Sequence, residues 1–88
     1  MAVSIKDSKI IYKMLADVFS KIFGKNINYK EANTKSISQW DSIRGVQLLL
    51  AIEDKFNLKF SFKEVEKFDS FEKIYNILIK KMSKKLNR

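Results

Sequence analysis

The residues from Ser42 to Phe56 constrain the fold of this chain most, because they place two apolar stripes on one expected helix. At about 100° per residue, the large apolar side chains fall in one arc roughly 100° wide and a second roughly 60° wide, centred about 130° away. Packing on a single core needs only one stripe, so the second needs a different burial partner. The first arc comprises Leu48, Leu49, Ile52 and Phe56 with Gly45, and the second comprises Ile43, Val46 and Leu50.

Ser42 lies at the edge of the second stripe, directly after Trp40 and Asp41. Asp41 or Ser42 can cap the helix, because a short side-chain oxygen accepts from the free N–H groups of the first turn. A serine in such a place is most often only a cap. The same N–H groups and the positive helix end also favour an attached anion, so a phosphodiester at Ser42 is physically reasonable.

Before this stretch the sequence predicts one helix and one long connection. Apolar residues at helical spacing predict a helix over residues 5–23, with Ser4 and Asp7 resembling a capping box and Gly24 suited to a left-handed exit. Residues 24–40 are polar and show no sustained period, so they form a long first loop. The expected core face of the helix is Ile11, Met14, Leu15, Val18, Ile22 and Phe23, and the candidate loop anchors are Ile27, Tyr29, Ile37 and Trp40.

After Asn57, which suits a left-handed helix exit, the sequence predicts two further helices. Leu58, Phe60 and Phe62 alternate with polar residues, but a lone short strand would lack a pairing partner. The capping box from Ser61 to Glu64 instead predicts a short helix over 62–67, and a box-like start at 69–72 predicts a fourth over 70–83. The buried face of the fourth helix comprises Phe71, Ile74, Tyr75, Leu78 and Ile79.

The composition excludes several classes of function. The 88 residues, expected to form the single domain 1–88, contain no cysteine and no histidine, so thiol chemistry and the usual general base near neutral pH are missing. Two glycines cannot build a glycine-rich phosphate loop. We expect no membrane span and no signal peptide, hence a cytoplasmic protein. The net charge of +8 suits a partner of anionic surfaces, although the lysines are spread along the chain.

The stretch Asp41-Ser42-Ile43, with the apolar and acidic pattern from Val46 to Phe56, resembles the acyl carrier protein family. The family pattern is D-S-L followed by a helix of the form xxVxLLxALEEEF. This resemblance implies an all-α fold, a four-helix bundle of the acyl-carrier-protein type with a long first loop and a short third helix. It also implies that Ser42 bears 4′-phosphopantetheine, while Asp41 caps the helix and contacts metal or transferase during loading.

By the same resemblance the protein is a carrier, not an enzyme, and is expected to be a monomer. A phosphopantetheinyl transferase loads it, and enzymes that activate or transfer acyl or aminoacyl groups then use it. The implied partner-binding residues are Ile43, Val46, Leu50, Glu53 and Asp54, beside which a short acyl chain could also fold. Basic or neutral residues stand where the family commonly has acids, which favours a dedicated partner set in a specialised pathway. These residues are Arg44, Gln47 and Lys55.

Two alternatives remain open from the residues alone. The charge of +8 fits a small helical nucleic-acid-binding protein, although a recognition helix should be polar and basic on its outer face. The chain could also be an interaction module of the same fold that is never loaded. A further choice concerns Trp40, whose ring either contacts the prosthetic arm or pins the long loop to the helices.

Overall fold

The computed structural model describes residues 5–25, 28, 31–37 and 40–86 of the chain. Within these ranges the protein is all-α, as expected, with four helices and no strand. A single bridge between Asn33 and Ser70 is the one β-type pairing in the described part. The helices are α1 (Ile5–Phe23), α2 (Ser42–Phe56), α3 (Phe62–Val65) and α4 (Phe71–Leu86).

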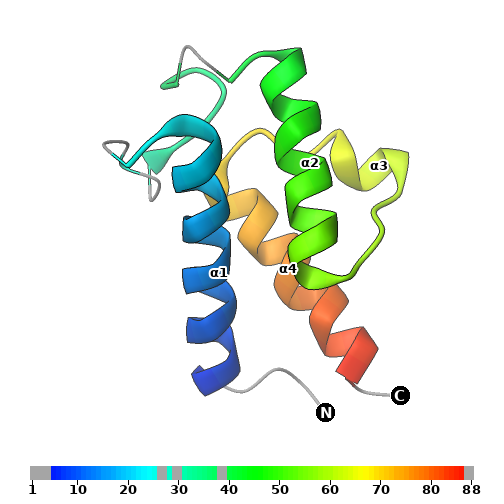
Figure 1. Cartoon of the computed structure of the whole chain (residues 1–88). Helices are drawn as coiled ribbons and strands as arrows, with labels where there is room; N and C mark the ends of the chain where they lie inside the picture. Colours follow the sequence, from blue (N-terminus) through cyan, green and yellow to red (C-terminus); the bar gives the residue numbers. More distant parts are fainter. Residues whose placement is uncertain (1–4, 26–27, 29–30, 38–39, 87–88) are drawn as a thin grey trace.

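The three longer helices surround one apolar core. α1 and α2 run antiparallel beside each other, and α4 also packs against α1 (Figure 1). The short α3 lies beside α2, on the side away from α1 (Figure 1). Ile52 of α2, Ile74 of α4 and Leu15 of α1 are fully buried, so all three long helices contribute to the centre of the core.

α1 buries a wider face than the sequence predicts. Of the expected residues, Ile11, Leu15, Val18 and Phe23 are buried, while Met14 and Ile22 are partly buried. Ala16 and Phe19 are buried as well, although the prediction did not include them. The face is wide because α1 packs against two helices at once. The expected exit at Gly24 is confirmed by its φ of 97°, whereas Ser4 lies outside the described residues.

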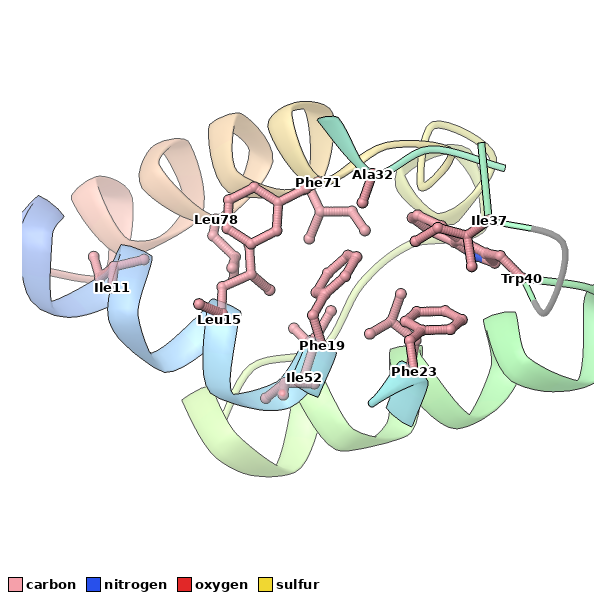
Figure 2. Close-up of a cluster of buried hydrophobic side chains, with 14 of the residues drawn as sticks. Ile11, Leu15, Phe19, Phe23, Ala32, Ile37, Trp40, Ile52, Phe71 and Leu78 are labelled. Carbon is pink, nitrogen blue, oxygen red and sulfur yellow. The ribbon is translucent and has the colours of Figure 1, made fainter. Parts of the chain in front are cut away.

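In its described part, the long first loop is anchored in the core by three side chains. Ile37 and Trp40 are buried as expected, and Ala32 joins them (Figure 2). The Trp40 ring packs against Phe19 and Phe23, with both pairs of ring centroids 5.4 Å apart. The tryptophan therefore pins the loop to α1. The other two candidate anchors, Ile27 and Tyr29, lie outside the described residues.

Backbone hydrogen bonds tie the same loop to the start of α4. The Thr34 N–H donates to the Asp69 carbonyl and the Phe71 N–H donates to the Ala32 carbonyl, both at 2.9 Å. Two segments far apart in sequence thus exchange main-chain donors and acceptors without forming a sheet. The loop is held between α1 and α4, which fixes the position at which α2 begins.

The predicted capping box of α3 is confirmed, but the helix is shorter than expected. The Ser61 hydroxyl accepts from the Glu64 N–H at 3.2 Å, and the Glu64 carboxylate accepts from the Ser61 N–H at 2.7 Å. The helix ends at Val65 rather than at residue 67. The reason is a tight turn, in which Lys67 and Phe68 donate to carbonyls three residues back instead of four.

The start of α4 corrects another prediction. The Ser70 hydroxyl accepts from the Lys73 N–H at 3.1 Å, so Ser70 caps the helix and Asp69 does not. The Asp69 carboxylate pairs instead with the Lys73 ammonium at 3.2 Å. The helix continues to Leu86, beyond the expected end at residue 83. Its core face is as predicted, with Phe71, Ile74 and Leu78 buried and Tyr75 and Ile79 partly buried.

Candidate functional site

Ser42 is the first residue of α2, and Asp41 is the cap. Asp41 has extended backbone geometry, and its Oδ1 accepts from the Arg44 N–H at 2.9 Å. Its carbonyl accepts from the Gly45 N–H at 2.8 Å, which closes the first turn. The sequence did not distinguish Asp41 from Ser42 as the cap of this helix. The hydrogen bond shows that Asp41 is the cap. The exposed Ser42 hydroxyl makes no hydrogen bond with any described residue, so capping does not occupy it.

Long-range contacts hold this helix start in place. Trp40 is 6% exposed and lies in the core directly before the cap. The Arg44 guanidinium Nη1 donates to the Ile22 carbonyl at 2.7 Å, at the C-terminal end of α1. A cation is favoured there because the last carbonyls of a helix carry partial negative charge. The start of α2 is thus fixed to the end of α1 from both sides of Ser42.

The two apolar stripes of α2 separate as predicted except at Leu49, which was assigned to the core stripe but is half-buried and lines the groove beside Ser42 instead. Leu48, Ile52 and Phe56 are at most 5% exposed and face the core. The residues of the second stripe, which we call the outer stripe, are exposed by 69% at Ile43, 55% at Val46 and 58% at Leu50. Within the described part of the chain nothing covers the outer stripe. An exposed apolar surface of this kind makes the outer stripe a candidate binding face.

A small groove begins at Ser42 and runs between α2 and α3. Its volume is about 180 Å³. Apart from Ser42 itself it has apolar walls, formed on α2 by Gly45, Val46 and Leu49 and on the other side by Val65 and Phe68. Val65 and Phe68 were not among the predicted site residues, because their place depends on how α3 docks. Ser42 therefore adjoins an apolar groove, which a serine that only caps a helix does not need.

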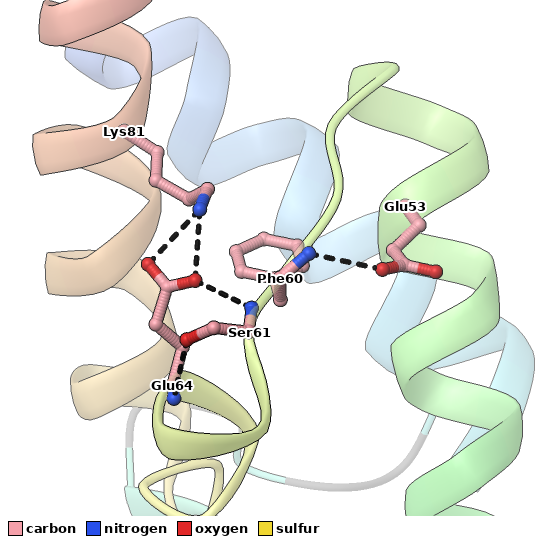
Figure 3. A network of polar contacts seen from close by, with 5 residues as sticks. All are labelled: Glu53, Phe60, Ser61, Glu64 and Lys81. Carbon is pink, nitrogen blue, oxygen red and sulfur yellow. Dashed lines mark hydrogen bonds and ion pairs between the residues drawn. The ribbon is translucent and has the colours of Figure 1, made fainter.

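The two predicted acidic residues of α2 have different environments. The Asp54 side chain is exposed and lines a depression of about 250 Å³ with Leu50 and Glu53. The Glu53 side chain is only 14% exposed, since its carboxylate accepts from the Phe60 N–H at 3.1 Å (Figure 3). Glu53 therefore holds the α2–α3 connection in place, and Asp54 is the more accessible acid.

An ion pair fixes the far wall of the groove. The Lys81 ammonium on α4 lies 2.8 Å and 3.0 Å from the two carboxylate oxygens of Glu64 on α3 (Figure 3). The hydrogen bonds from Lys81 and from the Ser61 N–H lower the pKa of the Glu64 carboxyl. Glu64 therefore serves α3 twice, as part of its capping box and as its link to α4. No local pattern could have revealed the link to Lys81.

The described residues contain no group of three or more acidic side chains placed to hold a metal ion. No helix among them is both long and apolar enough to cross a bilayer. Comparison with protein families, with curated proteins and with solved structures finds no match for this chain.

Proposed function

We propose that this chain is an acyl or aminoacyl carrier protein, and that Ser42 is the attachment site of 4′-phosphopantetheine. The proposal rests on the head of α2, where the Ser42 hydroxyl makes no hydrogen bond with any described residue. This helix buries one apolar stripe in the core and exposes a second beside the serine. A serine that acts only as a cap needs neither the free hydroxyl nor the exposed stripe. Because the sequence from Asp41 to Phe56 resembles the acyl carrier protein family, we also propose that the four helices form a bundle of that family's type.

The residues around Ser42 fit the prosthetic group. The oxygen that would join the phosphodiester is exposed, and Asp41 has already taken over the capping role. The first-turn N–H groups and the positive end of α2 favour a phosphate there. The apolar groove starts at the same serine and offers room for part of the arm or a short acyl chain. When attached, the group supplies a terminal thiol that holds the acyl or aminoacyl unit as a thioester.

This chain supplies positioning rather than catalysis in the proposed reaction. Loading needs only the Ser42 hydroxyl, because a phosphopantetheinyl transferase brings coenzyme A and Mg²⁺. Asp41 keeps the serine at the surface and presents its second carboxylate oxygen to the transferase or its metal. Ile43, Val46 and Leu50 form an apolar docking face for the enzymes that add or remove the acyl group, with Asp54 at its edge.

The charge pattern favours a dedicated set of partners. Arg44 stands near Ser42, where the family usually has acids, and is bonded to the end of α1. Gln47 is neutral, and the Glu53 carboxylate is engaged by the Phe60 N–H and by the Lys59 ammonium. A partner that requires a strongly acidic α2 should bind this surface poorly. Binding of nucleic acid through α2 is less well supported, since its outer stripe is apolar rather than basic.

The test is loading in vitro, followed by intact-protein mass spectrometry. Incubation with a broad-specificity transferase, Mg²⁺ and coenzyme A should add one phosphopantetheine unit to the wild type. Ser42→Ala should remain unmodified yet folded, because Asp41 still caps α2. Ser61→Ala is the matched control, since it removes a serine that does cap a helix, and it should load like the wild type. The proposal that the chain is a carrier would be wrong if several transferases left the wild type unmodified, or if Ser42→Ala were modified.

A further inference from the structure

A second face of the molecule carries a basic stripe on α4. The stripe lies on one side of the helix, because its residues are spaced by three, one and three positions. They are Lys73, Asn76, Ile77 and Lys80. The buried residues Phe71, Ile74 and Leu78 occupy a different side. The stripe therefore faces away from the core. It contains no acidic residue.

The stripe lines a groove between α4 and the end of α3. Lys67 from the α3–α4 connection joins Lys73, Ile77 and Lys80 around a space of about 370 Å³. An adjoining space of about 180 Å³ shares Lys67, Ile77 and Lys80 and extends to Lys81 and its ion-pair partner Glu64. None of these residues lines the groove at Ser42, whose α3 side is formed by Val65 and Phe68. The basic groove is thus a separate surface.

The charges in this groove are only partly neutralised. Lys81 is paired with Glu64 at 2.8 Å, and Lys73 with Asp69 at 3.2 Å. No described carboxylate lies within ion-pair distance of Lys67 or Lys80, which share the same wall. Two exposed lysines, Lys67 and Lys80, beside a half-buried Ile77 make a surface that is positive at its rim and apolar at its floor. The protein's net charge of +8 reinforces its attraction for anions.

We propose that this groove binds an acidic amphipathic segment of a partner protein, with an apolar side chain over Ile77 and carboxylates at Lys67 and Lys80. The combination of exposed lysines with the half-buried Ile77 selects this occupant. A bilayer needs apolar side chains that protrude from the surface, whereas Ile77 lies between lysines. A nucleic acid would use the lysines but gain nothing from an apolar floor. A peptide helix uses both features through side chains at helical spacing.

The proposal does not depend on modification of Ser42, so its test uses the Ser42→Ala protein, which cannot be loaded there. The probe is a designed helical peptide with glutamates flanking a leucine stripe, titrated against isotope-labelled protein by NMR. We expect saturable binding that weakens with salt and moves the amide signals of residues 73–81 more than those of α1. Failure to load Ser42 in the earlier test would leave this result unaffected.

Charge reversal decides whether the groove itself is used. Lys67→Glu with Lys80→Glu should weaken peptide binding at least about tenfold, since two charge pairs become repulsive. The control, Lys9→Glu with Lys13→Glu on α1, makes the same change in net charge at exposed positions and should weaken binding less than about threefold. All four sites are exposed, and circular dichroism checks folding. Equal losses in both variants, absence of saturable binding, or tighter capture of duplex DNA or anionic vesicles through Lys67 and Lys80 would overturn the proposal.

Discussion

At the scale of single residues, Asp41 caps α2, while the neighbouring Ser42 presents an exposed hydroxyl at the same helix start. Because Asp41 accepts from the Arg44 N–H, capping does not use the Ser42 hydroxyl, which makes no hydrogen bond with any described residue. The sequence already placed both residues at the helix start, but it could not say which of them caps. That choice depends on the path of the loop, which the buried Trp40 fixes.

We predict that the two roles of Asp41 can be separated. Asp41→Ala should lower the free energy of unfolding by about 1 kcal/mol, because the cap is lost, and Asp41→Asn should restore most of it, since asparagine caps equally well. Asp41→Asn should nevertheless load more slowly than the wild type, because the carboxylate charge is gone. Urea unfolding and initial loading rates measure the two effects. Wild-type loading by Asp41→Asn would reduce Asp41 to a cap.

A second prediction concerns the pH dependence of stability. The folded protein lowers the pKa of Glu64 from the ordinary value of 4.5, chiefly through the hydrogen bond from Lys81. Its stabilising effect is therefore complete above the unfolded pKa and is lost as the pH falls through the lower folded pKa. Glu64→Gln should melt below the wild type at about pH 7, and the gap should narrow at about pH 3. A gap that is the same at both pH values would contradict this role for Glu64.

At the scale of elements, the local patterns predicted most of the helices and their ends. The bounds of α1 and α2, the exits at Gly24 and Asn57 and the capping box of α3 all follow from residues within one or two turns. The missed features depend on contacts between distant segments. Ser70 caps α4 because the first loop holds that backbone through the Phe71 N–H, and no local pattern decides between Asp69 and Ser70.

We predict that the first loop contributes to stability through Trp40. Trp40→Ala should destabilise the fold by about 3–5 kcal/mol, since a large buried ring is lost from between Phe19 and Phe23. Ile10→Ala serves as the control, because this large apolar residue is 49% exposed on α1 and should cost at most about 0.5 kcal/mol. Chemical denaturation gives both values. A Trp40→Ala variant as stable as the control would mean that the ring does not anchor the loop.

At the scale of the whole molecule, the predicted and the unpredicted parts of the candidate site differ in kind. Helical periodicity alone placed Val46 and Leu50 beside Ser42, because all three belong to α2. Val65 and Phe68, which form the opposite wall, could not be predicted, since α3 is positioned by an ion pair between residues 17 apart in sequence. The same limit applies to the basic groove, which exists only once α3 lies against α4.

We propose that α2 serves two surfaces, the protein's own core and a face for other molecules. Thermal unfolding of Leu50→Ala beside Ile52→Ala distinguishes these surfaces, since the two residues are 58% and 0% exposed on the same helix. Ile52→Ala should cost roughly 2–5 kcal/mol, a large share of a small domain's stability, while Leu50→Ala should melt close to the wild type. Equally large destabilisation by both substitutions would mean that the outer stripe is ordinary core and not a surface for other molecules.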